Sequence, residues 1–189
     1  QGGQAFLAQA DLRDAEQIAR LFAQVDGWGC PLRVWVNSAA VMPAQDADTM
    51  AAEEWDAVMD LNLRAPFLCA QQAARRMESG GVIINLSDSG AVKAWSGFPA
   101  YTVSKAGVEA LTRVLARRWG PRVRVNAVAP GLILRGEMTS AEEWQSLTGR
   151  LPMRTGGGPQ DVVRAVAFLI ENAYITGETL VVDGGYRLI

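Results

Sequence analysis

The chain has 189 residues, 49% of them hydrophobic, and its 18 basic and 20 acidic side chains give a net charge of −2. This composition fits one globular domain over residues 1–189 and offers no basic surface for nucleic acid. Histidine is absent from the sequence, which excludes a Ser-His-Asp triad or a histidine-ligated zinc site, so acid–base chemistry must fall to Tyr, Lys, Asp or Glu.

Short β-rich runs alternate with longer helical ones, the pattern of an α/β fold with a parallel sheet. The near-continuous apolar run 82–86 is typical of a strand covered on both faces. We therefore expect a doubly wound parallel sheet with helices on both sides. The predicted strands are 5–11, 33–38, 81–87, 122–128 and 178–183.

Helical periodicity fills the segments between these runs. Ile18 and Phe22 share one side of a predicted helix over 13–25. We predict two helices within residues 52–79, with a break near Ala65–Pro66, because a proline disfavours helical backbone angles in the residue before it. Further helices are predicted at 99–119 and 159–171.

A polar or small residue stands at the end of every predicted strand. In an open parallel sheet, ligands bind beyond the carboxyl ends of the strands, so this pattern favours an enzyme over an interaction module. Asp183 is expected to organise the Gly184–Gly185 turn instead of touching a ligand. The strand-end residues are Asp11, Asn37, Ser87, Pro130–Gly131 and Asp183.

Tyr101 and Lys105 are four residues apart, so they share one face of the predicted helix. A free tyrosine has a pKa of about 10, and an ammonium group one helical turn away should lower it. The pair predicts a tunable proton donor. Taken alone, the spacing is weak evidence, because an exposed helix produces it by chance.

Five stretches together resemble the short-chain dehydrogenase/reductase family along essentially the whole chain. "AYTVSKAG" (100–107) is similar to its Tyr-x-x-x-Lys helix, and "MDLNLRAPF" (59–67) to the segment with its catalytic asparagine. The resemblance implies a Rossmann-type sheet and NADP, or NAD, as cofactor. The other stretches are "VNSAA" (36–40), "RVNAVAPGLI" (124–133) and "ITGETLVVDGG" (175–185).

The resemblance also implies roles for individual residues. Tyr101 would be the catalytic acid/base, Lys105 would lower its pKa and hold the nicotinamide ribose, and Asn62 would hold a water of a proton relay. Two alternatives stay open: Asn62 as a buried structural amide, and Asp11 as the N-cap of helix 13–25. The implied cofactor contacts are Asp11 (adenine), Asn37 and Ala39 (adenosine ribose side), Tyr101, Lys105, Pro130, Gly131 and Ile133 (carboxamide).

Asp88 departs from the family pattern, which places a serine thirteen residues before the tyrosine. A carboxylate would repel negative charge developing on a carbonyl oxygen, but it suits a substrate rich in N–H donors. The pteridine and dihydromonapterin reductases of this family, which reduce C=N bonds of pterins with NADPH, resemble the chain here and in its ending "DGGYRLI". We expect Asp88 to face the ring nitrogens of such a pterin. In the alternative, Ser87 or Ser89 takes the serine's place and Asp88 turns to solvent.

Smaller departures bear on the same site. Ala40 stands where the family often has glycine, and Arg135 where a cofactor-contacting threonine is common, which leaves the carboxamide contact open. Met42 is expected to line the substrate pocket, where a flexible thioether suits a flat ring. The family's opening strand, glycine-rich turn and helix have no counterpart, so about two βα units, on the order of 50 residues, would precede Gln1 or the chain would not bind cofactor.

These observations predict an NADPH-dependent reductase of the pteridine type with a small-molecule substrate. The alternatives are a carbonyl reductase or alcohol dehydrogenase of the same family, and a non-catalytic member. We expect a homo-oligomer, a tetramer or dimer, paired through helices 63–79 and 99–119. No apolar run reaches membrane-spanning length and no signal peptide is evident, so a cytoplasmic location with buried, reduced Cys30 and Cys69 is expected.

Overall fold

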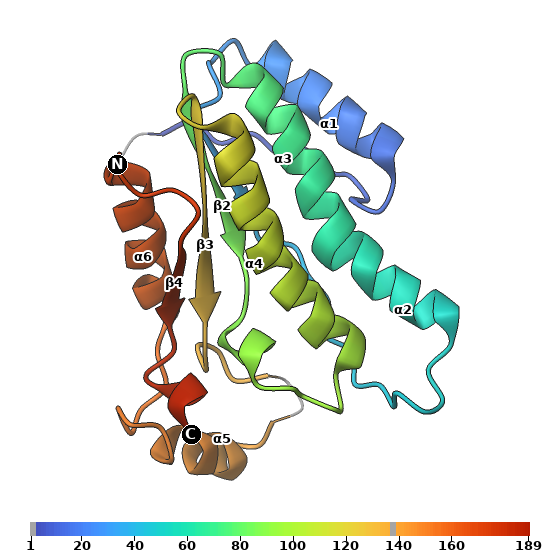
Figure 1. Cartoon of the computed structure of the whole chain (residues 1–189), viewed down its shortest axis with the longest axis vertical. Helices are drawn as coiled ribbons and strands as arrows, with labels where there is room; N and C mark the ends of the chain where they lie inside the picture. The colour runs from blue at the N-terminus through green and yellow to red at the C-terminus, as the bar shows by residue number, and fades with distance from the viewer. Residues whose placement is uncertain (1–2, 137–138) are drawn as a thin grey trace.

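A computed structural model describes residues 3–136 and 139–189 and arranges their strands in one parallel sheet of order β1-β2-β3-β4 (Figure 1). All three neighbouring pairs are parallel, so the carboxyl ends of the strands lie at one edge. Four of the five predicted strands are confirmed within two residues. They are β1 (Val34–Asn37), β2 (Gly81–Leu86), β3 (Val123–Pro130) and β4 (Thr179–Val182).

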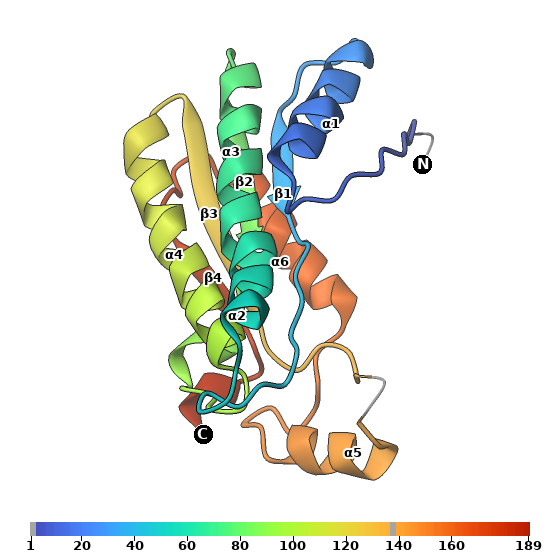
Figure 2. The ribbon, with the colours of Figure 1, turned by 90° about the vertical axis from the view of Figure 1, so that its right-hand side faces the viewer.

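The fifth predicted strand, residues 5–11, is wrong. The segment is extended chain with no strand pairing, and it leads away from the sheet (Figure 2). Alternating apolar residues form a strand only where a neighbour accepts their backbone hydrogen bonds, and no described strand lies beside this segment. Its contacts are local: Phe6 stacks on Trp28 with ring centroids 5.1 Å apart.

Two helical layers cover the sheet, one on each face (Figure 2). Ile83 points to one face and joins a core with Ile18 and Phe22, whereas its neighbours Val82 and Ile84 point to the other face. The first layer is α1 (Ala15–Gly27), α3 (Ala65–Arg76) and α4 (Pro99–Trp119), and the second is α6 (Pro159–Glu171).

The predicted break at Ala65–Pro66 is also wrong. A π-helical turn, Asp60–Arg64, joins α2 (Ala52–Met59) to α3 without interruption, and Ala65 keeps helical angles of φ −59° and ψ −48°. Pro66 lies in the first turn of α3, directly after the π turn, where its missing N–H is tolerated.

Helix α5 (Ala141–Gly149) was not predicted, because its single buried residue, Thr148, gives almost no apolar stripe. The one feature of the sequence that indicates this helix is a capping box. Ser140 Oγ accepts a hydrogen bond from Glu143 N at 3.1 Å, and the Glu143 carboxylate accepts one from Ser140 N. The prediction for the cysteines is half right. Cys69 is buried, which raises its thiol pKa to about 11, but Cys30 is exposed after α1.

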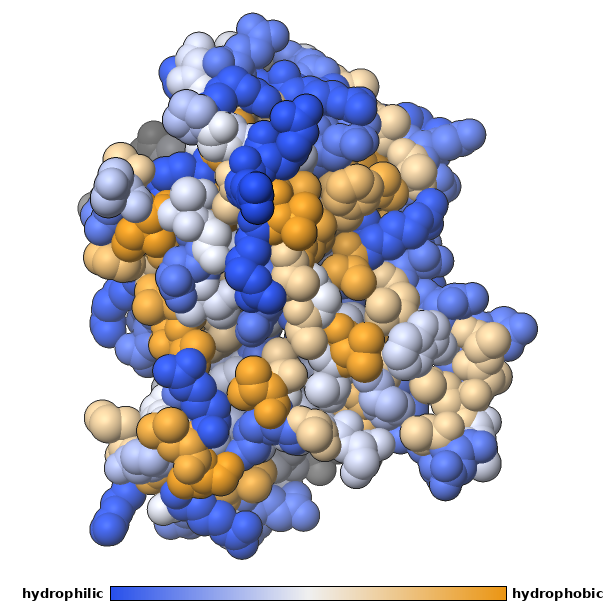
Figure 3. Space-filling model, viewed as in Figure 1, coloured by the Kyte–Doolittle hydropathy of each residue, from blue (hydrophilic) through white to orange (hydrophobic). Residues whose placement is uncertain are grey.

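The outer surface of α3 and α4 carries hydrophobic side chains that the chain itself does not cover. Phe67, Val103 and Val114 are exposed there, and Figure 3 shows hydrophobic patches along these helices between hydrophilic strips. In the described part of the chain, no helix combines the length and the hydropathy that a membrane crossing requires.

A buried ladder of amide and hydroxyl groups ties the sheet to α4. Asn37 Nδ2 donates to Asn85 Oδ1 at 2.8 Å, and Asn85 Nδ2 donates to Thr112 Oγ1 at 2.9 Å. Asn85 and Thr112 have no exposed surface. Buried polar groups must be paired, so each link of this ladder protects the next.

Thr112→Val should destabilise the fold by about 1–3 kcal/mol, because Asn85 Nδ2 would lose its acceptor in the interior. Thr102→Val, on the same helix, is the matched control: Thr102 Oγ1 is buried and has no partner among the described residues, so removing it should leave stability unchanged or raised. Urea unfolding of both variants measures the difference. Equal midpoints would show that the ladder does not support the fold.

Candidate active site

The predicted acid/base residue meets Asp88 at the carboxyl edge of the sheet. Asp88 follows β2, Tyr101 lies in the first turn of α4, and the Tyr101 hydroxyl donates to Asp88 Oδ2 at 2.7 Å. The other carboxylate oxygen, Oδ1, accepts from Gly90 N at 2.6 Å and caps the short 3₁₀ turn Ser89–Val92. Asp88 therefore points at the tyrosine and is not turned to solvent, as the alternative had it.

Neither neighbouring serine takes this place. Ser87 Oγ lies 3.2 Å from Lys105 O and 3.1 Å from Glu109 Oε1, so it is turned toward α4. Ser89 Oγ is buried without a hydrogen-bond partner among the described residues. The geometry thus contradicts the alternative in which Ser87 meets the tyrosine, and it leaves Ser89 without a contact to Tyr101.

Burial dominates the protonation of the pair. Removal from water raises the pKa of Asp88, although the hydrogen bond from Tyr101 and the charge of Lys105 oppose this. Burial and the charge of Asp88 together raise the pKa of Tyr101. At neutral pH the phenol is therefore a neutral hydrogen-bond donor to Asp88.

Lys105 was expected to lower the pKa of Tyr101, and in the structure that expectation is wrong. Its Nζ donates to Leu86 O at 2.8 Å and lies 5.7 Å from the centre of the Tyr101 ring. The spacing of four residues does bring the two side chains together, but burial and Asp88 raise the pKa of the phenol. Burial also lowers the pKa of Lys105 itself, to about 8.

Asn62 is 1% exposed and lies in the π turn, beneath the tyrosine. Its Oδ1 accepts from Val41 N at 2.9 Å, and its Nδ2 donates to Val41 O at 2.8 Å and to Ser104 Oγ at 3.2 Å. Ser104 Oγ in turn donates to Tyr101 O at 2.7 Å. Both amide hydrogens are used inside the protein, so the side chain joins the loop after β1 to α4.

At the end of β1, where the resemblance implied the adenosine, the side chain of Asn37 is also fully used. It accepts from Trp35 Nε1 at 2.7 Å and donates to Pro66 O and Asn85 Oδ1. A cleft of about 190 Å³ opens beyond the end of β1, with Leu12, Ser38 and Ala39 among its lining residues.

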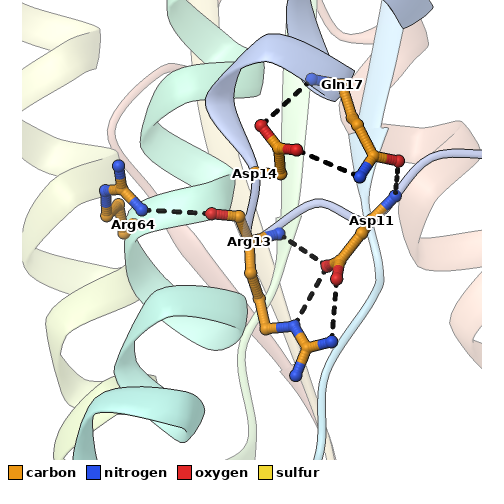
Figure 4. Close-up of polar contacts among 5 residues, drawn as sticks. All are labelled: Asp11, Arg13, Asp14, Gln17 and Arg64. Atoms are coloured by element: carbon orange, nitrogen blue, oxygen red, sulfur yellow. Dashed lines mark hydrogen bonds and ion pairs between the residues drawn. The ribbon is translucent and has the colours of Figure 1, made fainter.

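Asp11 comes directly before Leu12, which lines this cleft. It forms an ion pair with Arg13, whose Nη2 lies 2.8 Å from Asp11 Oδ2 (Figure 4). This bond holds the pKa of Asp11 at about 2. The N-cap of α1 is Asp14, which accepts from Glu16 N at 2.8 Å, so the alternative role of Asp11 as the cap is wrong.

The ends of β3 and β4, where the resemblance implied the nicotinamide, approach closely. Gly131 N donates to Val182 O at 3.0 Å, and a Cβ on Gly131 would lie 2.7 Å from Asp183 Cα, so only glycine fits. Ile133 lines a cavity of about 300 Å³ with Thr155 and Gly184. The prediction for Asp183 is confirmed, since it accepts from Gly185 N at 2.8 Å and Arg187 N at 2.9 Å.

Met42 is 42% exposed and lines a groove against α2 with Val41, Pro43 and Val58. Two aromatic residues without a predicted role lie near Tyr101: Trp95 is parallel to the Tyr101 ring, and Tyr186 packs against Trp95. The sequence pointed to Tyr186 only through the family resemblance of the ending "DGGYRLI", and no sequence pattern pointed to Trp95.

Comparisons with known proteins identify the family of the chain. A family model described as "Enoyl-(Acyl carrier protein) reductase" matches residues 1–187. The chain is 40% identical over 200 aligned residues to 3beta-hydroxysteroid dehydrogenase 1 of Eggerthella lenta, covering 99% of this chain and 76% of that protein. It is 36% identical over 192 residues to 3-oxoacyl-[acyl-carrier-protein] reductase FabG of Staphylococcus aureus, covering 97% and 78%.

Among solved structures, FolM alternative dihydrofolate reductase 1 from Brucella canis, complexed with NADP, superimposes with a TM-score of 0.90 at 29% identity, covering 96% of this chain and 73% of that one. A short-chain alcohol dehydrogenase from Sinorhizobium meliloti gives 0.87 at 34% identity, covering 96% and 75%. The chain belongs to the short-chain dehydrogenase/reductase family of NAD(P)-dependent oxidoreductases, and its parallel sheet is the Rossmann-like fold of that family.

Tyr101→Phe should lower turnover by about 10²–10⁴-fold, because the ring stays but the proton donor is lost. Affinity for NADPH, measured by fluorescence titration, should stay within a few fold. Tyr174→Phe, at a fully exposed tyrosine, is the matched control and should keep full activity. Substantial activity in Tyr101→Phe would show that another group supplies the proton.

Lys105 makes stability depend on pH in a predictable direction. Its pKa is 10.5 in the unfolded chain and about 8 in the fold, so between these values the unfolded protein binds more protons and the fold gains stability as pH rises. The full gain corresponds to about 3 kcal/mol. Lys105→Met should lack it, as urea midpoints at several pH values above neutrality would show. Parallel pH profiles in the two proteins would contradict the burial of a titrating ammonium.

Proposed function

We propose that this protein reduces a C=N bond of a pterin, of the dihydropterin or dihydrofolate type, with NADPH. The observation that carries the proposal is the 2.7 Å hydrogen bond between Tyr101 and Asp88, which puts a carboxylate in the position of the family's usual serine. A buried carboxylate is a strong acceptor for the N–H groups that line a pterin edge. It is a poor partner for a carbonyl oxygen that gains negative charge.

Reduction of a C=N bond adds a hydride to carbon and a proton to nitrogen. Bound NADPH supplies the hydride. The chain supplies the proton through the hydroxyl of Tyr101, which stays protonated at neutral pH because burial and the charge of Asp88 raise its pKa. Lys105, buried beside the ring of Tyr101, orients the phenol and is placed to contact the cofactor ribose.

The residues of the chain fit part of the cofactor. Two residues that line the cleft beyond β1, Ser38 and Ala39, have small side chains that would leave room for an adenosine. The ionised Asp11 next to this cleft, which Arg13 already binds, would also accept a hydrogen bond from the adenine. Pro130, Gly131 and Ile133 would flank the nicotinamide. The glycine run Gly156–Gly158 precedes α6 but follows a helix and loop, so it is not the strand–turn–helix that holds a pyrophosphate.

The comparisons support NADP and a pterin substrate in one respect: the Brucella canis protein is named a dihydrofolate reductase and holds NADP. Carbonyl reduction is the competing function, because the relatives from Eggerthella lenta and Staphylococcus aureus are named for a hydroxysteroid and an oxoacyl substrate. A non-catalytic role is disfavoured by the formed Tyr101–Asp88 pair.

We infer a cytoplasmic homo-oligomer, a dimer or tetramer, built through the uncovered face of α3 and α4. Phe67 on α3 lines a groove there with Leu63, Gly107 and Leu111. A Cβ on Gly107 would lie 2.8 Å from Leu63, so α4 packs closely against the π turn at this groove. Because Tyr101 is in the first turn of α4, pairing on this face would brace the site.

Asp88→Ser should lower the ratio of kcat/KM for dihydrobiopterin to that for butane-2,3-dione by about ten- to a hundredfold. The variant loses a charge-assisted partner for ring N–H groups and gains a hydroxyl for a carbonyl oxygen. Ser87→Ala and Ser89→Ala are the matched controls and should leave the ratio unchanged.

Two outcomes would reject the pterin assignment. One is an equal effect of Asp88→Ser on both substrates. The other is a serine variant that changes the ratio more than Asp88→Ser does, which would place that hydroxyl at the reacting group.

A further inference from the structure

Trp95 is fixed beside the catalytic tyrosine. Its indole lies within 8° of parallel to the Tyr101 ring, with centroids 6.4 Å apart, and it meets Phe98 edge-on at 6.2 Å. A Cβ on Gly90 would lie 2.4 Å from the indole, so the ring rests directly on the backbone of the turn that Asp88 caps. The indole, the phenol and the carboxylate are therefore parts of one rigid unit.

The C-terminal turn adds a second aromatic ring to this unit. Tyr186 begins the short 3₁₀ turn Tyr186–Leu188, which contacts the turn Ser89–Val92. Its ring lies 6.1 Å from Trp95 at 52°. Burial and the charge of Asp88 raise the pKa of Tyr186, so its phenol shares the electrostatic environment of that carboxylate.

Lys93 holds the C-terminal turn in place. Its Nζ donates to Tyr186 O at 3.0 Å and to Ile189 O, and it lies 4.1 Å from the centre of the Tyr186 ring, within cation–π range. Gly185 has a φ of +87°, and a Cβ there would lie 2.5 Å from Pro152. Two side chains, Lys93 and Asp183, thus hold a turn whose backbone suits only glycine.

We propose that Trp95 and Tyr186 form an aromatic wall that makes the site selective for flat, conjugated rings, with Lys93 as a positioning residue. Aromatic faces stack well on planar π systems and gain little from small aliphatic groups beyond area burial. The wall deepens the proposed function, since it rests on the site at Asp88 and Tyr101, but it concerns the shape of the substrate and not the bond that is reduced.

The test compares two ketones and a pterin with NADPH: isatin, which is flat and bicyclic, butane-2,3-dione, which is small and aliphatic, and dihydrobiopterin. Trp95→Leu and Tyr186→Leu should each lower the ratio of kcat/KM for isatin to that for the dione by about three- to tenfold, mainly through KM for isatin. Lys93→Met should lower the same ratio, and Lys93→Arg should restore it. Tyr174→Leu, at a fully exposed tyrosine, should leave it unchanged.

Circular dichroism checks that each variant is folded. If Tyr186→Leu does not fold, Trp95→Leu carries the test, and Tyr186→Phe, which keeps the ring, should leave the ratio unchanged. An equal loss on both ketones, or an unchanged ratio, would overturn the wall. Failure of the wild-type protein to reduce dihydrobiopterin would reject the proposed function alone, because the ketone ratio would still decide the wall.

Discussion

The hydrogen bond from Tyr101 to Asp88 is the interaction around which the site is organised. It joins the end of β2 to the first turn of α4, two elements also linked by the bond from Lys105 to Leu86 O. Asp88 can remain buried because Gly90 N and the phenol satisfy its oxygens. The same burial that raises the pKa of this carboxylate raises that of the phenol, so the pair keeps a proton at neutral pH.

The hydrophobic periodicity of the sequence predicted those helices and strands in which the apolar residues are also the buried ones. The run 82–86 is apolar throughout because Ile83 packs under α1 and α3 while Val82 and Ile84 pack under α6. Residues 5–11 have the pattern of a strand but no pairing partner among the described residues, and α5 has too small a buried face to show a period. Pro66 indicated a break that the π turn avoids.

The candidate site, like the fold, was predicted in part from the sequence. The residue spacing and the family resemblance predicted that Asp88, Tyr101 and Lys105 lie close together, and the structure confirms this. The direction of the pKa change at Tyr101 was not predictable, since it depends on burial and on a carboxylate that spacing alone does not orient. Trp95 and Tyr186 lie 91 positions apart in the chain and meet only through tertiary packing.

The central claim, that Asp88 is a buried carboxyl group bonded to the phenol, is tested most directly by carbon-13 NMR titration of the Asp88 carboxyl. The account predicts a pKa above the ordinary value of 3.8, and a further rise in Tyr101→Phe, because the phenol stabilises the charged form. A pKa at or below the ordinary value, or one that does not move in Tyr101→Phe, would contradict it.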